Sequence, residues 1–216
     1  MKHYDTVIFD LDGTLLDTIE DLANSLNHTL AQFDVPTLPV PTIQSYVGNG
    51  LRRLLELSIP EGLDHPKFED IFTTFRDYYI DHCKEATAPY PGIMDLLEKL
   101  REKKIPMAIV SNKNDTAVKE LAVDFFDGLI SVAIGEREGI SKKPAPDTVF
   151  AALKELDCSS FHAVYVGDSE VDLQTAANSG MDCITVSWGF KGRAFLEKEG
   201  ASTIIDTPEE LLDFFI

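Results

Sequence analysis

The sequence predicts an α/β fold: a doubly wound parallel (Rossmann-like) sheet core with an inserted all-α domain. Short β-branched apolar runs alternate with amphipathic helical patterns along most of the chain. This alternation is typical of parallel strands joined by right-handed helical crossovers. One long segment near the N-terminus interrupts it with helical patterns only. These two observations predict a sheet-based core and a separate helical insert.

The expected strands are short, nearly continuous apolar runs, as in a parallel sheet that is buried on both faces. They are Thr6–Phe9, Met107–Val110, Leu129–Ile134, Ala163–Val166 and Ile184–Ser187. Amphipathic patterns between and after them predict helices over Ile93–Lys103, Asn114–Val123, Asp147–Leu156 and Asp172–Asn178. A closing helix is expected over Pro208–Phe215, because a proline and acidic residues stand at its start.

The segment from about Thr18 to Lys84 contains no convincing buried strand. Its apolar stripes and separating prolines predict helices over Ile19–Phe33, Val47–Leu57 and Phe68–Cys83. We therefore expect residues 17–85 to form a helical domain, and residues 1–16 and 86–216 to form the α/β core. The stretch Ala88–Gly92 is the expected return hinge.

The chain has 216 residues, with 19 basic and 37 acidic side chains and a formal net charge of −18. Nonspecific nucleic-acid binding and docking on an anionic membrane need basic patches, so neither partner is expected. Three widely spaced cysteines form no CxxC pair, which fits a reducing compartment. The first apolar run is too short for a signal peptide or a membrane span, and we expect a cytoplasmic protein. Monomer and homodimer both remain open.

Polar side chains follow four of the expected strands. These segments are Asp10–Thr14, Ser111–Lys113, Lys142–Asp147 and Gly167–Asp172. Doubly wound sheets bind their ligands beyond the carboxyl ends of the strands. The sequence therefore predicts that carboxylates, a hydroxyl and an ammonium converge on one rim of the sheet.

These residue types suit metal-assisted phosphoryl transfer. Asp10 and Asp168 could hold Mg²⁺, which would neutralise a substrate phosphate. Asp10 could attack phosphorus to form an aspartyl-phosphate. Asp12 could protonate the leaving alcohol and later activate water. Ser111 and nearby backbone N–H groups could bind phosphate oxygens, while Lys143 offsets their charge.

These motifs resemble, in order and in strand context, the four motifs of the haloacid dehalogenase superfamily of phosphatases. They are Asp10–Asp17, Ser111–Asn112, Lys143–Pro144 and Gly167–Asp172. The helical insert after the first motif resembles that family's helical cap. Further segments make the chain most similar to the family's phosphoglycolate phosphatases: Tyr46–Gly50 with Arg52, Tyr90–Gly92 and Lys143–Asp147.

The resemblance implies a role for each matched position. Asp10 is expected to be the nucleophile and a Mg²⁺ ligand. Asp12 is expected to be the general acid/base, with its main-chain carbonyl also binding Mg²⁺. Asp168 is the expected direct metal ligand, and Asp172 is expected in the outer shell or orienting Lys143. The implied phosphate-binding positions are Thr14, Ser111, Asn112 and Lys143.

The helical insert carries a candidate specificity loop at Gly48–Gly50. It lacks the third glycine of a GxGxxG motif and the Lys-Ser/Thr of a P-loop, so it is not a nucleotide motif. Gly48 and Arg52 are expected to contact substrate, with Arg52 pairing with a substrate carboxylate. The alternatives are a simple helix-start turn at Gly48, and an outward helix face at Arg52 or a role for Arg53 instead.

The expected activity is Mg²⁺-dependent hydrolysis of a small phosphate monoester, with phosphoglycolate as the leading substrate and the helical insert closing over it. Dehalogenases of the superfamily lack an acid at the position of Asp12, so its presence favours phosphatase or phosphomutase chemistry. Rivals of the same superfamily are a sugar phosphomutase similar to β-phosphoglucomutase, a pyrophosphatase and a nucleotidase. Rivals of another class are a phospho-aspartate signalling domain, which does not carry such an insert, and a catalytically silent binding domain.

Overall fold

The computed structural model describes residues 2–215. Contacts divide the chain into two compact units, Met1–Leu16 with Pro89–Ile216, and Asp17–Ala88. The first unit is built on a parallel sheet, and the second contains α-helices. Each unit is described by itself.

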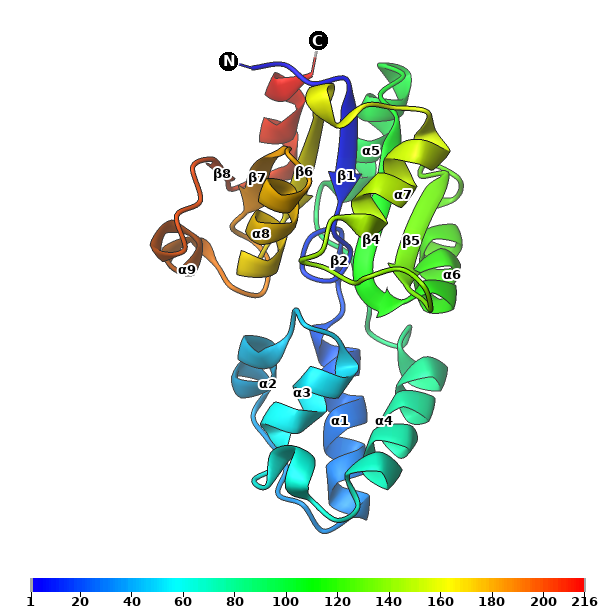
Figure 1. Ribbon diagram of the computed structural model, residues 1–216, viewed down its shortest axis with the longest axis vertical. Helices are drawn as coiled ribbons and strands as arrows, with labels where there is room; N and C mark the ends of the chain where they lie inside the picture. Colours follow the sequence, from blue (N-terminus) through cyan, green and yellow to red (C-terminus); the bar gives the residue numbers. More distant parts are fainter. Residues whose placement is uncertain (1, 216) are drawn as a thin grey trace. The chain divides into compact units, whose positions relative to one another are not determined.

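The described part of the first unit contains a six-stranded sheet with the order β5-β4-β1-β6-β7-β8 (Figure 1). Its strands are β1 Thr6–Phe9, β4 Met107–Asn114, β5 Val132–Glu136, β6 Ala163–Gly167, β7 Asp182–Val186 and β8 Ile204–Ile205. All the neighbouring pairs are parallel. The chain moves from β1 to β4 and β5 on one side, then to β6 and β7 on the other. This reversal beside β1 is the point where doubly wound sheets bind ligands.

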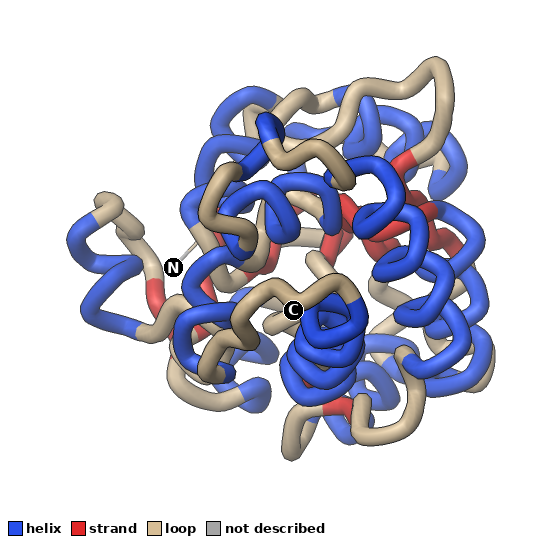
Figure 2. Tube along the Cα trace, turned by 90° about the horizontal axis from the view of Figure 1, so that it is seen from below, coloured by secondary structure: helices blue, strands red, loops and turns tan. Residues whose placement is uncertain are grey.

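Helices cover both faces of this sheet (Figures 1 and 2). The helices are α5 Ile93–Glu102, α6 Asp115–Phe126, α7 Asp147–Leu156 and α8 Glu170–Asn178. Alternate residues of β1 point to opposite faces. Val7 and Phe9 belong to the core under α5 and α6, whereas Ile8 belongs to the core under α7 and α8. The α/β fold class predicted from the sequence is confirmed.

Several boundaries differ from the prediction. Strand β4 continues past Val110 to Asn114, with a register shift against β5. Strand β5 starts only at Val132, because a turn in which Leu129 N–H donates to the Phe126 carbonyl follows α6. The closing helix is the 3₁₀-helix η3, Pro208–Phe214. The short elements α9 Arg193–Lys198 and β8 were not expected, since so few residues carry little periodicity.

The Asp17–Ala88 unit contains α1 Ile19–Gln32, α2 Val40–Tyr46, α3 Leu51–Ser58, η1 Gly62–Asp64 and α4 Phe68–His82. Leu26, Leu30 and Phe75 are fully buried in its own hydrophobic core. Helix α2 was not predicted, although Pro41 in its first turn is a typical helix-start signal. The expected helix over Val47–Leu57 begins four residues later, at Leu51.

The Asp21 carboxylate connects the two ends of this unit. Asp21 lies in the first turn of α1 and is 2% exposed. It accepts hydrogen bonds of 2.8 Å from the backbone N–H groups of Ala86 and Thr87, at the other end of the unit. The two ends of the segment are therefore held together by a buried, charge-assisted contact. Short strands β2 Leu16–Asp17 and β3 Ala88–Pro89 pair with each other in a separate two-stranded sheet.

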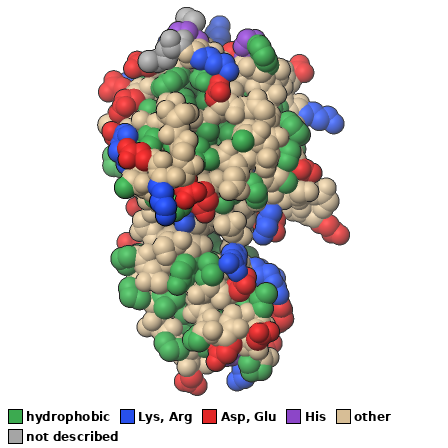
Figure 3. All heavy atoms as spheres, turned by 60° about the vertical axis from the view of Figure 1, so that its left-hand side comes forward, with side chains coloured by type: hydrophobic (Ala, Val, Ile, Leu, Met, Phe, Trp, Pro, Cys, Tyr) green, Lys and Arg blue, Asp and Glu red, His purple; other side chains and the backbone are tan. Residues whose placement is uncertain are grey.

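Acidic and basic side chains are interspersed on the face shown in Figure 3. The three cysteines, Cys83, Cys158 and Cys183, are free thiols. Within residues 2–215, no helix has both the length and the apolar character that crossing a membrane requires.

Candidate active site

The carboxyl ends of three adjacent strands supply the central residues of the site. Asp10 follows β1, Ser111 lies on β4, and Asp168 follows β6. Strand β1 pairs with both β4 and β6. Since parallel strands end at the same edge of a sheet, the topology alone brings these three positions together. Lys143 comes from the loop between β5 and α7.

Three buried carboxylates form a compact cluster at this edge. Each of Asp10, Asp168 and Asp172 offers an oxygen, and these oxygens all lie within 4.8 Å of one another. Lys143 lies among them with its side chain only 2% exposed. Its Nζ is 2.8 Å from Asp10 Oδ1 and 2.9 Å from Asp172 Oδ1. It also donates to the Tyr165 hydroxyl at 3.1 Å.

Burial and mutual repulsion change the pKa values of these groups. Burial, with the nearby charge of Asp172, raises the pKa of Asp10 to about 7, although Lys143 opposes the shift. Burial and the charges of Asp172 and Asp10 hold the pKa of Asp168 well above its usual range. Burial alone would lower the pKa of Lys143, but the carboxylates of Asp10 and Asp172 raise it well above its ordinary value. The cluster therefore has an excess of negative charge that one ammonium does not neutralise.

Asp172 is held by contacts inside its own turn. Its Oδ2 accepts from the Ser169 hydroxyl at 2.6 Å and from the backbone N–H groups of Asp168 and Ser169 at 3.1 Å. This is the capping box that begins α8. Because its other oxygen contacts Lys143, Asp172 is placed to orient that lysine.

Asp168 is fixed by close backbone approach. Its Oδ2 accepts from Phe190 N–H at 2.6 Å. Gly13 has a φ of +83°, and a Cβ there would lie 2.4 Å from the same oxygen. Only glycine combines this backbone conformation with this approach. The Asp-x-Asp-Gly motif thus needs its glycine because the loop after β1 touches the carboxylate after β6.

Asp12 forms an ion pair with a second lysine, Lys113. Lys113 Nζ lies 3.1 Å from Asp12 Oδ1, and the two side chains are 6% and 19% exposed. The backbone N–H of Lys113 donates to the Ser111 hydroxyl at 3.2 Å. Asn112, on the same strand, donates from Nδ2 to the Lys143 carbonyl at 3.1 Å. Thr14 is buried, and its Oγ1 has no hydrogen-bond partner among residues 2–215.

The two predicted substrate contacts of the helical unit lie on and before α3. Gly48 has a φ of +130° and precedes the helix by three residues. Arg52 is half exposed and forms a bidentate ion pair with Glu69. Its guanidinium also lies over the rings of Phe68 and Phe72, 5.0 and 5.3 Å from their centroids. Arg52 is thus preorganised by partners inside its own unit.

Sequence reasoning gave no role to two side chains of the site, Tyr165 and Lys113. Tyr165 occupies an apolar position inside β6, and only the structure shows its hydroxyl beside Lys143. Lys113 carried a usable signal. A strand places residues two apart on the same face, so a strand continued through Ser111 would have placed Lys113 on that residue's side.

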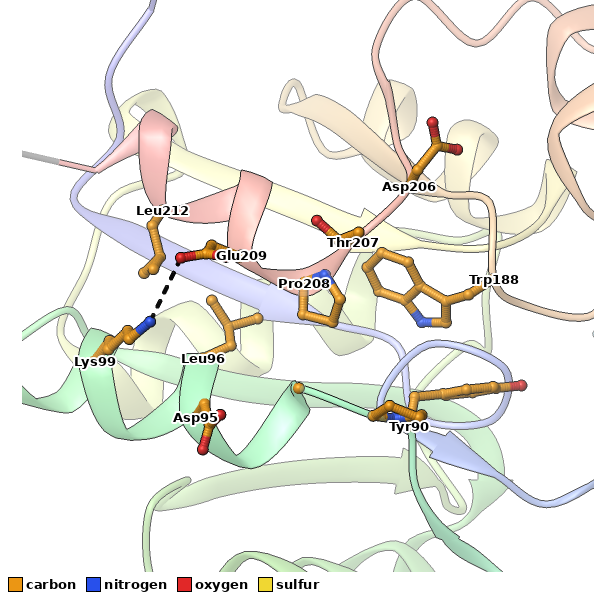
Figure 4. A pocket seen from close by; sticks show the side chains of 12 residues that line it. Tyr90, Asp95, Leu96, Lys99, Trp188, Asp206, Thr207, Pro208, Glu209 and Leu212 are labelled. Atoms are coloured by element: carbon orange, nitrogen blue, oxygen red, sulfur yellow. Dashed lines mark ion pairs between the residues drawn. The ribbon is translucent and has the colours of Figure 1, made fainter.

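A separate cleft of about 410 Å³ lies between the N-terminal parts of α5 and η3 (Figure 4). Tyr90, Pro208 and Trp188 line it, together with the ion pair of Lys99 and Glu209. The described residues that line it include none of the predicted catalytic side chains. Trp188 connects the cleft to the loop after β1, because its indole N–H donates to the Thr14 carbonyl at 3.1 Å.

The donors of the carboxylate cluster fit a divalent cation. Hard cations such as Mg²⁺ take carboxylate oxygens, and Asp10 and Asp168 bring two of them to one buried place. A cation there would offset the burial and the mutual repulsion that raise both of their pKa values. The oxygens of Asp172 are already engaged by Lys143 and the α8 cap, which suits a position outside the direct ligand set.

Residues 7–186 match the family of haloacid dehalogenase-like hydrolases, and the chain therefore belongs to that family. It is similar to the phosphoglycolate phosphatase of Pseudomonas putida, at 30% identity over 95% of this chain and 78% of the relative. The phosphoglycolate phosphatase of Chromobacterium violaceum is 31% identical, over 99% and 97% of the two chains.

A solved structure resembles the chain over its whole length. It is that of a Lactobacillus delbrueckii subsp. bulgaricus protein proposed to be a phosphoglycolate phosphatase. The identity is 39% and the TM-score is 0.94, covering 100% of this chain and 99% of the other. The expected resemblance is confirmed, and the chain is a phosphatase-type hydrolase of this family.

Proposed function

We propose that the protein is a Mg²⁺-dependent phosphomonoesterase that works through an aspartyl-phosphate on Asp10. The observation that carries the proposal is the buried contact of Asp10 with Lys143, beside Asp168 and two residues before Asp12. A nucleophilic carboxylate, a fixed ammonium and a proton-transfer group are then supplied at one sheet edge.

The reaction proceeds in two displacements. In the first, a carboxylate oxygen of Asp10 attacks phosphorus, the bond from phosphorus to the ester oxygen breaks, and Asp12 gives its proton to the leaving alkoxide. In the second, Asp12 takes a proton from water, the water oxygen attacks phosphorus, and the bond from phosphorus to Asp10 breaks. The products are an alcohol and inorganic phosphate, and both aspartates return to their starting states.

The other residues hold the transferred group and its charge. Lys143 lies against Asp10 and supplies positive charge to the phosphoryl oxygens. Ser111, Asn112 and the buried Thr14 are the proposed phosphoryl-binding positions. Mg²⁺ would be held by Asp10, the Asp12 carbonyl and Asp168, with Asp172 in the outer shell, and would supply charge neutralisation at the phosphate.

Phosphoglycolate is the substrate we propose, and the names of the relatives at 30–31% identity support it. We also propose that residues 17–85 form a cap that selects the substrate, with Gly48 and Arg52 as its contacts. Arg52 could meet the glycolate carboxylate with the planar fork that it now presents to Glu69. A cytoplasmic location stays a prediction.

The test is a phosphate-release screen with and without Mg²⁺. The panel contains phosphoglycolate, sugar phosphates, nucleotides, pyrophosphate and p-nitrophenyl phosphate. We expect Mg²⁺-dependent release with the highest kcat/KM for phosphoglycolate, and no turnover by a folded Asp10→Asn variant. Isomer formation without release would indicate a phosphomutase, and preference for another ester would overturn the substrate assignment. Turnover of p-nitrophenyl phosphate by Asp10→Asn at the parent rate would refute the mechanism.

A further inference from the structure

The two aspartates of the loop after β1 each have a separate buried lysine. Asp10 contacts Lys143, which comes from the loop before α7. Asp12 contacts Lys113, which comes from strand β4. Lys143 is shared between Asp10, Asp172 and the Tyr165 hydroxyl, whereas the ion pair of Lys113 is with Asp12. The proposed mechanism gives Lys143 a task and gives Lys113 none.

A buried lysine needs a reason, because an ammonium removed from water is costly even when it is paired. Stabilising the sheet is a weak reason here. Strands β1 and β4 are already joined by backbone pairing from Val7–Met107 to Phe9–Ile109. The ion pair of Lys113 instead reaches beyond the end of β1 to a side chain that transfers protons.

The backbone around Lys113 is irregular, and this irregularity accompanies the contact with Asp12. Strand β4 changes register against β5 between Val110 and Asn114, at the positions that carry Ser111 to Lys113. Within this irregular stretch, the N–H of Lys113 donates to the Ser111 hydroxyl. The base of the lysine is thus fixed by the phosphate-binding strand, and its ammonium lies 3.1 Å from Asp12 Oδ1.

We propose that Lys113 is a positioning residue that holds the Asp12 carboxyl in the orientation needed for proton transfer to the leaving group and from water. This inference rests on the proposed phosphatase function and adds one residue to it. Lys113 does not carry the transferred proton and does not bind the phosphoryl group. Its removal should weaken proton transfer while leaving the attack by Asp10 intact.

The dependence on the leaving group separates this role from the alternatives. An alkoxide needs a proton as its bond to phosphorus breaks, whereas p-nitrophenolate is stable enough to leave without one. The value of kcat/KM reports the steps up to the first irreversible bond cleavage, so it isolates the first displacement. It is measured for phosphoglycolate, or for the best alkyl ester of the screen, and for p-nitrophenyl phosphate.

We expect Lys113→Met to lose roughly 10- to 100-fold in kcat/KM for the alkyl ester, since a positioned acid or base contributes about 10²–10⁴-fold. The loss for p-nitrophenyl phosphate should stay below about threefold, because that leaving group depends little on the acid. Lys113→Arg keeps the charge and should recover part of the alkyl activity. Lys113→Gln repeats the test if the Met variant does not fold.

Two further comparisons complete the experiment. Lys119→Met is the matched control, because Lys119 is an exposed lysine paired with Asp115 on α6. It should leave both substrates unchanged. In the Asp12→Asn background, adding Lys113→Met should cost nothing more for the alkyl ester, since the group that Lys113 positions is already absent.

An equal loss for both substrates would overturn the proposal, because it would show that Lys113 binds the phosphoryl group. Unchanged kcat/KM for the alkyl ester would also overturn it, as would additive losses with Asp12→Asn. These outcomes differ from failure of the proposed function. In that case the unaltered protein would release no phosphate from either ester, or Asp10→Asn would remain active.

Discussion

Replacing Asp10 with asparagine should stabilise the metal-free protein while it abolishes turnover. Asp10 lies buried beside Asp168 and Asp172, and Lys143 is the ammonium in contact with it. Above neutral pH the parent must keep the Asp10 carboxylate ionised inside the fold. Asparagine has nearly the same shape and no charge, so it removes part of the repulsion. The proposed nucleophile is therefore a residue whose negative charge destabilises the metal-free fold.

The magnitude follows from the pKa of Asp10, which burial and the charge of Asp172 raise from 3.8 to about 7. One pKa unit corresponds to about 1.4 kcal/mol, so the ionised group costs the fold at most roughly 4 kcal/mol. A carboxyl whose pKa is higher in the folded state binds a proton there first. Stability therefore falls as the pH rises from about 4 to about 7, and the full cost is present above that window.

The assay is urea unfolding of the parent and Asp10→Asn in EDTA at pH 5 and pH 8. We expect the variant to be more stable by roughly 2–4 kcal/mol at pH 8 and by clearly less at pH 5. Saturating Mg²⁺ should stabilise the parent by about 3 kcal/mol at one hundred times Kd, and the variant by less. A variant that is less stable than the parent at pH 8, or an advantage that does not change with pH, would refute the reasoning.

Two further predictions concern the glycine of the first motif and a carboxylate at the base of α6. Gly13→Ala should lower kcat/KM about 100-fold, because its Cβ would meet Asp168 Oδ2 at 2.4 Å and displace it; phosphate release within threefold of the parent would contradict this. Asp115 accepts from Gly135 N–H at 2.9 Å and pairs with Lys119. Burial opposes the change, yet these partners lower the pKa of Asp115. The stability that ionised Asp115 contributes is therefore fully present above about pH 4. This stability is lost as the pH falls through the lowered pKa. Asp115→Asn should cost about 1 kcal/mol at pH 7 and little at pH 2.5 in urea unfolding, and an equal cost at both pH values would oppose this account.

The sequence predicted most of the core because its signals are local. Strand Thr6–Phe9 and helix Asp147–Leu156 were predicted to the residue, since a buried apolar run and an amphipathic period each define them. The convergence of Asp10, Ser111 and Asp168 on one edge followed from strand order in a parallel sheet. No side-chain geometry was needed for that inference.

The misses depend on interactions between distant residues. The end of β4 was placed at Val110, because hydrophobicity stops there, but backbone pairing continues to Asn114. The hydrophobic pattern does not show that extension, and it is the extension that brings Lys113 beside Asp12. Tyr165 fits the apolar pattern of its strand because of its ring. That pattern gives no indication that its hydroxyl contacts Lys143.

The contact that Asp21 makes with Ala86 and Thr87 bears on the order in which the chain folds. The helical unit, Asp17–Ala88, adds about 70 residues to the chain between β1 and β4. Closing a flexible loop of that length costs about 2–3 kcal/mol more in chain entropy than closing one of a few residues. Once the helices form and Asp21 binds the far end of the segment, the effective loop that must close for β1 to pair with β4 becomes shorter. Helices that form early would then speed sheet assembly, because the chain joining the first two strands is already drawn together.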